Sequence, residues 1–250
     1  MKHKTLATAL VALALVAPGL HAQTAPATGA VNPASIQALK DMGAHLQSLK
    51  RFQVSTELTG ERVLADGQKL QHAAAANIDV QRPGMLRARM ASSRSEREIF
   101  FDGKKATLYT PAQKYYSTVE FSGNISELVG KLAERYGLEI PLSDLFLWGT
   151  PDAPLDKIES AMNAGQDVID GDLCDHYAFR EGNIDWQIWI TAEGKPLPRK
   201  LVITNRTDEA RPQSVSLISW NLKPTFKDAA FKFAPPKGAT AVELRSLEKK

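Results

Sequence analysis

The residues best suited to covalent chemistry stand in GDLCDHYAFREGNIDWQIWI, residues 171–190, which holds the only cysteine of the chain. Cys174 and His176 are two positions apart on a predicted strand, so their side chains share one face. Such a pair forms a thiolate nucleophile with its base only when the thiol is accessible and a third group, such as Asp185, orients the histidine. It also supplies only two metal ligands, without a CxxC or HExxH pattern. The simpler expectation is that Cys174 packs as a small hydrophobe and His176 forms a hydrogen bond in or near a sheet wall.

Large apolar side chains alternate along the next predicted strand. Trp186, Ile188 and Ile190 occupy one face, and Trp189 shares the other face with polar residues. Both faces of this hairpin therefore carry bulky apolar groups. One face is expected to meet helices, and the other either lines a ligand cavity or packs on a second layer. Cys174, His176, Trp186 and Trp189 are accordingly candidate cavity residues.

Arginines are concentrated upstream, where Arg87 and Arg89 alternate with apolar residues. Arginine forks suit carboxylate and phosphate groups, so Arg87 and Arg89 are candidates for holding the head group of an anionic lipid at a barrel mouth. The alternative is a solvated outer face that Glu96 and Glu98 partly neutralise.

The stretch LEIPLSDLFLWGTPDAPL, residues 138–155, is too apolar for a free surface. It is either a lid over a cavity, gated by Pro141 and Gly149, or a permanent plug. Its candidate ligand-contacting residues are Leu142, Leu145, Phe146 and Trp148.

The N-terminus has the pattern of a secretory signal peptide, with Lys2 and Lys4 before an apolar run. Cleavage is expected after Ala22, with a cut after Ala27 as the alternative. Residues 23–33 are predicted to be a flexible leader, and residues 34–250 a single domain. Because Gln23 follows the expected cut, the mature protein is predicted to be soluble and not lipidated. Removing the two lysines leaves 29 basic and 28 acidic residues, which gives no general case for nucleic acid as a partner. One cysteine forms no internal disulfide.

The elements that position these residues follow from their periodicity. Apolar residues at spacings of three and four predict a helix within PASIQALKDMGAHLQSLKRF, which begins at Pro33, and the period changes to two from residue 52 to residue 121. GNISELVGKLAERYG carries helix ends, with Asn124 as cap, Glu127 in a capping box and Gly137 as the stop. Two further short helices are predicted within IPLSDLFLWG and PLDKIESAMNAG.

After residue 165 the strand pattern returns, and AAFKFAPPKG is expected to give a final short strand and a Pro-Pro break. Many hairpins without βαβ alternation favour an α+β fold, in which a curled antiparallel sheet forms an open half-barrel and helices cap its concave face.

Several segments resemble a family of predicted periplasmic proteins of unassigned function: FFDGKKATLYTPAQKYYSTVE, LAERYGLEIPLSDLFLWG, GDLCDHYAFREGNIDWQIWI, PLPRKLVITN and FKFAPPKGA. That family is similar to the lipoprotein and lipid carriers, the LolA-like and LppX-like proteins, which share an unclosed barrel capped by helices. The resemblance implies this half-barrel and a location in the periplasm. It implies no activity, because the family has none assigned.

Three functions follow as hypotheses. The first is a periplasmic binding or carrier protein for a hydrophobic ligand, such as an acyl chain, a lipid or a lipoprotein, with no cofactor and no metal. A membrane-bound partner protein would be compatible with this role. The second is a thiol-dependent hydrolase or transferase that uses Cys174 and His176. The third is a protein-interaction module in which Leu145, Phe146 and Trp148 fill the interior.

Overall fold

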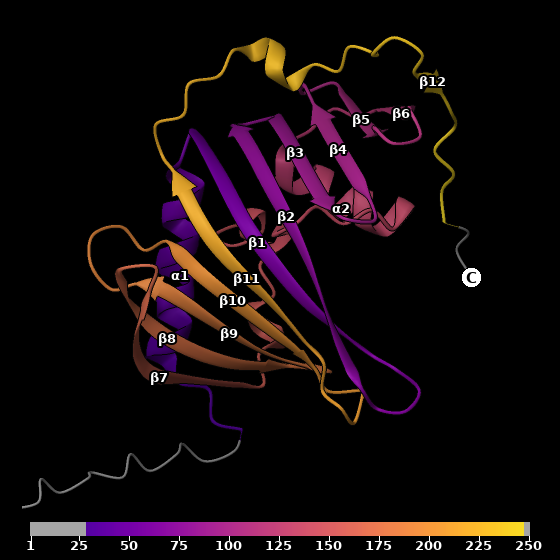
Figure 1. The fold of residues 1–250 in the computed structure, drawn as a ribbon. Helices are drawn as coiled ribbons and strands as arrows, with labels where there is room; N and C mark the ends of the chain where they lie inside the picture. Colours follow the sequence, from indigo (N-terminus) through magenta and orange to yellow (C-terminus); the bar gives the residue numbers. More distant parts are fainter. Residues whose placement is uncertain (1–28, 248–250) are drawn as a thin grey trace, which may run out of the picture.

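The computed structural model describes residues 29–247, in which twelve strands form one curled sheet (Figure 1). The strands are β1 Arg51–Val63, β2 Lys69–Gln81, β3 Met85–Ser92, β4 Glu96–Phe101, β5 Lys105–Thr110, β6 Tyr115–Glu120, β7 Ser160–Ile169, β8 Asp172–Glu181, β9 Ile184–Thr191, β10 Pro198–Asn205, β11 Gln213–Asn221 and β12 Thr240–Ala241. The helices are α1 Pro33–Ser48 and α2 Ile125–Tyr136, with short 3-10 helices η1 Ser143–Phe146, η2 Leu155–Lys157 and η3 Asp228–Phe231.

The sheet consists of two antiparallel meanders joined side by side. Its strand order is β12-β6-β5-β4-β3-β2-β1-β11-β10-β9-β8-β7, so the first meander meets the second where β1 pairs with β11. Only the two-residue β12 runs parallel to its neighbour, β6. The outermost strands β7 and β12 do not pair with each other, so the sheet curls without closing. This confirms the predicted open half-barrel.

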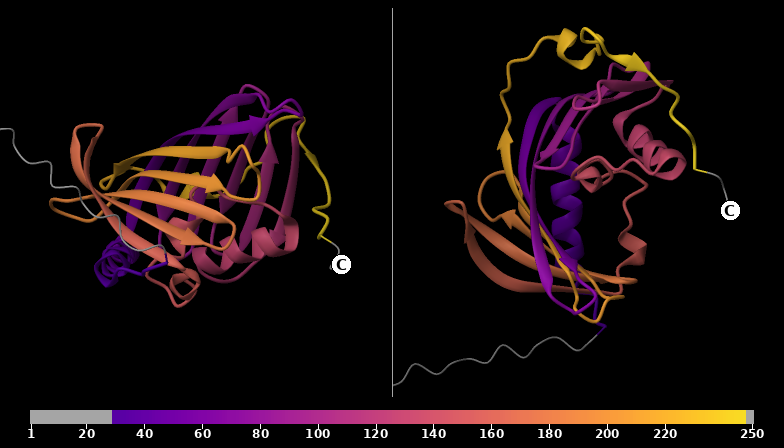
Figure 2. Two further views of the ribbon diagram at one scale, coloured as in Figure 1. Left: turned by 90° about the horizontal axis from the view of Figure 1, so that it is seen from below. Right: turned by 45° about the vertical axis from the view of Figure 1, so that its right-hand side comes forward.

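The helices α1 and α2 lie on the concave side of the sheet (Figure 2). The buried stripe of α1, with Leu39, Met42 and Leu46, belongs to the same apolar core as Val54 and Ile78 from the inner faces of β1 and β2. In α2 the predicted capping box is present. The Glu127 backbone N–H donates to the Asn124 side chain at 3.0 Å, and the Asn124 backbone N–H donates to the Glu127 carboxylate at 3.0 Å.

The segment between α2 and β7 differs from the predicted pair of helices. Only η1 and η2 form there, and the second predicted helix is wrong in its second half because β7 begins at Ser160. Ala161 pairs with Phe179 of β8, and a bulge lies between Asn163 and Gly165. The weak local preference for helix loses to pairing along the whole length of β8.

Both chain ends add detail to the predictions. Residues 1–22, the predicted signal peptide, lie outside the described residues. The end of the predicted leader pairs with β7, because the Asn32 N–H donates to the Ala161 carbonyl at 3.0 Å. The predicted final strand around Phe231 is wrong. Residues 228–231 form η3, and Phe233 packs outside the sheet among Phe100, Tyr109 and Tyr116.

Two glycines allow α1 to touch the segment that precedes η2. A Cβ atom on Gly43 would lie 2.5 Å from the backbone nitrogen of Gly149, so a side chain there forces backbone to move. We expect Gly43→Ala to lower the free energy of unfolding by about 1–3 kcal/mol in urea titrations. Gly130→Ala in α2 is the control, because its Cβ would meet nothing within 4 Å and helix propensity alone should stabilise the protein. If Gly43→Ala is as stable as the unaltered protein, α1 and the segment at Gly149 can move apart without loss of stability, which would contradict this prediction.

Candidate ligand cavity

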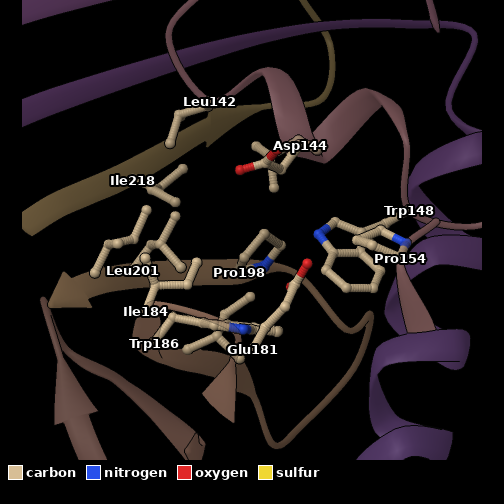
Figure 3. Close-up of a pocket in the computed structure, with 13 residues that line it drawn as sticks. Leu142, Asp144, Trp148, Pro154, Glu181, Ile184, Trp186, Pro198, Leu201 and Ile218 are labelled. Atoms are coloured by element: carbon tan, nitrogen blue, oxygen red, sulfur yellow. The ribbon is translucent and has the colours of Figure 1, made fainter. Parts of the chain in front are cut away.

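A cavity of about 180 Å³ opens between the inner faces of β9, β10 and β11 and the residues around η1 (Figure 3). Strand alternation explains its aliphatic wall, because every second residue of these strands points inward. That wall consists of Ile184, Ile188, Leu201, Ile203 and Ile218. The apolar lining also includes two leucines and two tryptophans, Leu142, Leu145, Trp148 and Trp186. The cavity is therefore apolar, and the protein's own side chains leave it open.

Residues 142–148 act as a plug beside this cavity. Phe146 is 2 % exposed and belongs to the main core. The plug is held through its backbone carbonyls. Gln47 Nε2 donates to the carbonyls of Trp148, at 2.7 Å, and Phe146, at 3.3 Å, and Ser126 Oγ donates to that of Phe146 at 2.7 Å. The plug thus fills one part of the concave space, while its other side forms a wall of the cavity.

Four of the candidate residues meet at the cavity, namely Leu142, Leu145, Trp148 and Trp186. Trp148 and Trp186 face each other across the lining, with ring centroids 5.8 Å apart. Phe146 belongs to the same plug but is not among the lining residues, because its ring packs into the core.

Cys174, His176 and Trp189 lie on the opposite face of the β8–β9 hairpin, away from the cavity. Cys174 and Trp189 form a small separate apolar cluster with Val202. The His176 ring stacks on Trp189 with centroids 4.0 Å apart. The prediction that these three side chains line the cavity is not supported by their position, because the cavity-facing residues of these strands are the ones that alternate with them.

The geometry also opposes the thiol-enzyme hypothesis. Cys174 Sγ donates to the Asp172 carbonyl at 3.5 Å, and His176 Nε2 donates to Gln187 Oε1 at 2.9 Å. The other ring nitrogen of His176, Nδ1, lies 3.5 Å from the Asp167 carboxylate, so no nitrogen of the ring is directed at the thiol. A nucleophile needs its base within hydrogen-bond reach.

The thiol of Cys174 is expected to be inert in the folded protein. Its side chain is 0 % exposed, and burial raises the pKa of the thiol, which lowers the thiolate fraction near neutral pH. With Cys174 as the sole cysteine, a colorimetric thiol reagent at pH 7.5 should show no fast reaction in buffer and one equivalent in urea. Rapid labelling of the folded protein would revive the thiol hypothesis.

Arg87 and Arg89 do not reach the cavity. They project from β3 on the face opposite the buried Leu86 and Ala88. Both arginines form ion pairs with carboxylates of β4. Arg87 Nη2 lies 2.8 Å from Glu98, and Arg89 Nε lies 2.6 Å from Glu96. The candidate head-group role is therefore corrected in favour of the alternative outer face, where acidic neighbours neutralise the arginines.

Two acidic residues that the sequence did not single out line the cavity, Asp144 of η1 and Glu181 at the end of β8. Solvent reaches the Asp144 side chain, yet the enclosing protein raises the pKa of its carboxyl, with the charge of Glu139 adding to the effect. Burial also raises the pKa of Glu181, against the opposing influence of Lys157. Neither carboxylate forms an ion pair with any residue between 29 and 247.

The raised pKa of Asp144 has a consequence for stability. The folded state holds this proton more tightly than the unfolded state, so stability falls as pH rises from about 4, the ordinary pKa of a carboxyl, through the folded value. We expect Asp144→Asn to raise the melting temperature at pH 7 and to lose this advantage below about pH 4. Glu209→Gln, on an exposed turn, is the control. An equal effect at both pH values would contradict the assignment.

The described part of the chain contains no group of three or more His, Cys, Asp or Glu residues that could hold a metal ion. Nor does any helix within residues 29–247 have the length and hydropathy needed to cross a membrane.

Comparison with known proteins places the sequence in a family. Residues 35–245 match the family described as "Predicted periplasmic protein (DUF2092)". The chain belongs to the DUF2092 family. The predicted membership is thereby confirmed, and the family's own description supports the predicted periplasmic location of this DUF2092 protein. A search of curated proteins gave no match.

Solved structures similar to this DUF2092 protein include LprF from Mycobacterium bovis, at 14 % identity and a TM-score of 0.45, covering 85 % of this chain and 100 % of that one. LppX from Mycobacterium tuberculosis has 14 % identity and a TM-score of 0.41, over 78 % and 98 % of the two chains. A LolA superfamily protein from Nitrosomonas europaea has 10 % identity and a TM-score of 0.37, over 80 % and 97 %. These likenesses concern the arrangement of strands and helices and say nothing about a ligand.

Proposed function

We propose that this protein is a periplasmic binding or carrier protein that takes up the alkyl part of a hydrophobic ligand, such as an acyl chain, a lipid or a lipoprotein. The observation that carries the proposal is the apolar cavity beside the plug, which the protein's own side chains leave unfilled. Buried apolar space of this kind favours an apolar guest, because transfer of alkyl groups out of water is favourable.

The size of the cavity sets how much of a ligand enters. A volume of about 180 Å³ holds about six groups of the size of a water molecule, at ~30 Å³ each. Burying six methylenes contributes about 5 kcal/mol, which corresponds to dissociation constants near or below a millimolar before ordering costs. The cavity therefore accommodates the end of one alkyl chain, and the remainder of a longer ligand extends through the mouth.

Deeper entry of a long chain requires the plug to move. Residues 142–148 occupy the adjoining space and are held by Gln47 and Ser126 through backbone carbonyls. Release of these three hydrogen bonds would let the plug leave the space that it occupies, and a longer chain could then enter it. We infer that long acyl chains bind with this displacement, whereas short ones bind without it.

The interaction-module hypothesis is less well supported, because it requires an interior without room for a guest. Phe146 does fill part of the concave space, but the cavity beside it remains. The membrane-bound partner stays a prediction from the sequence, as do the absence of lipidation and the soluble mature form.

The decisive experiment is native mass spectrometry of protein purified from the periplasm, followed by organic extraction and analysis of the extract. We expect one alkyl-bearing molecule per chain, and uptake of added 1-octanol by any protein that is recovered empty. A bare mass together with no measurable binding of 1-octanol would reject the proposed function.

A further inference from the structure

The charged side chains that line the cavity are both acidic. Asp144 and Glu181 enter the lining from opposite walls, one from the plug and one from β8, and both carboxylates are seen in the close-up of the cavity (Figure 3). Among residues 29–247, no lysine, arginine or histidine lines this cavity. Neither carboxylate has an ion-pair partner among residues 29–247. Both are therefore free to form an ion pair with a cationic group of a ligand.

The surroundings strengthen this polarity. Glu139 acts on the Asp144 carboxyl, and Asp156 and Glu159 act on Glu181, in each case as like charges that raise the pKa. Lys157 acts on Glu181 in the opposite direction. An anionic head group would therefore meet repulsion, whereas a cation would relieve it.

A second feature is independent of the carboxylates. Trp148 and Trp186 both line the cavity, with ring centroids 5.8 Å apart and planes inclined at 39°. Phe179, which is not part of the lining, supports Trp186 by stacking at 4.2 Å. Indole faces attract cations through the ring quadrupole, and aromatic rings are the usual recognition elements for quaternary ammonium groups.

We propose that the cavity selects amphiphiles that carry an ammonium head group and discriminates against carboxylate and phosphate head groups. The ammonium group would lie beside the carboxylates of Asp144 and Glu181 and the indole rings of Trp148 and Trp186, and the alkyl chain would pack on the aliphatic wall. This inference rests on the proposed function, because it names the class of ligand for the same cavity. It reverses the head-group preference that Arg87 and Arg89 suggested from the sequence.

The test compares three ligands with the same eight-carbon chain. Isothermal titration at pH 7.5 with octylamine, 1-octanol and octanoate separates the head group from the chain. A charge-assisted hydrogen bond contributes about 1.5–3 kcal/mol, so octylamine should bind at least about tenfold more tightly than 1-octanol. Octanoate should bind more weakly than 1-octanol.

The double variant Asp144→Asn and Glu181→Gln removes both charges and keeps the side-chain shapes. We expect the ratio of its affinities for octylamine and 1-octanol to fall by at least about tenfold, and measurable binding of 1-octanol reports that the cavity is intact. Glu209→Gln removes an acidic charge from an exposed turn and should leave all three affinities unchanged.

The outcomes separate this inference from the proposed function. Binding of 1-octanol with equal or tighter binding of octanoate than of octylamine overturns the ammonium preference and leaves the hydrophobic-ligand function standing. An octylamine preference that survives in the double variant also overturns it, because other groups would then supply the attraction. Failure of all three ligands to bind overturns both.

Discussion

Replacing Phe146 with alanine is expected to lower the free energy of unfolding by about 3–5 kcal/mol, the usual cost of removing a buried phenylalanine ring. Phe146 is 2 % exposed and lies in the main core, on the concave side of the sheet. Its carbonyl also accepts hydrogen bonds from Gln47 and Ser126, so the backbone on either side has little freedom to close the space. Urea-induced unfolding followed by tryptophan fluorescence measures the change.

Leu147→Ala is the matched control, since Leu147 is the next residue of the plug and is only partly buried. It should cost clearly less than Phe146→Ala. If the two variants lose the same amount, or if Phe146→Ala loses under about 1 kcal/mol, the segment is a loosely held lid and not an integral part of the core.

Leu201→Trp is expected to abolish uptake of an eight-carbon alcohol, with a loss in affinity of at least about a hundredfold. Leu201 lies on β10 in the aliphatic wall and is only partly buried by the protein, so a larger side chain grows into the cavity. Filling empty apolar space commonly stabilises a protein by about 0.5–2 kcal/mol, so the variant should fold. Titration calorimetry with 1-octanol and a thermal melt together measure both effects.

The control for Leu201→Trp is Leu217→Trp. Leu217 is on the neighbouring strand β11 and is 45 % exposed, on the face opposite to Ile218 of the cavity lining. It adds an indole of the same size without entering the cavity and should leave affinity for 1-octanol unchanged. Full binding by Leu201→Trp would place the ligand somewhere other than this cavity.

The sequence was most informative where local chemistry decides the structure. The capping box of Asn124 and Glu127 and the stop at Gly137 depend on neighbouring residues only, and all three appear as predicted. The hairpin pattern likewise predicted an antiparallel, curled sheet. Residues 160–165 were misassigned to a helix because their pairing partner lies on β8, outside the range of any local pattern.

The faces of the β8–β9 hairpin show why the candidate site was predicted only in part. Trp186 and Trp189 lie on opposite faces of β9. Both are buried, Trp186 in the main core and Trp189 in the small outer cluster. Ile169 and Val215 pack against Cys174, Val202 and Trp189 on the outer side, which gives that face an apolar pattern like that of the inner one. Periodicity separates two faces and does not say which of them encloses a cavity.

Asp144 and Glu181 escaped the sequence analysis for a related reason. Each is a single acidic residue next to a turn or a short helix, where acidic side chains are ordinarily solvated. Their importance comes from meeting across the cavity, which depends on how the plug docks against β8. An unpaired acid inside a strongly apolar insert was the one available signal, and it applies to Asp144 only.

The pairing of β1 with β11 also affects how quickly the protein folds. Gln53 pairs with Asn221 and Gly60 with Ser214, so this seam forms only after almost the whole chain has emerged. Contacts between such distant residues slow folding, because a long loop must be ordered before they form. We expect the first meander to keep an unpaired strand edge until the second meander has formed, which exposes it to chaperones or to aggregation in that interval.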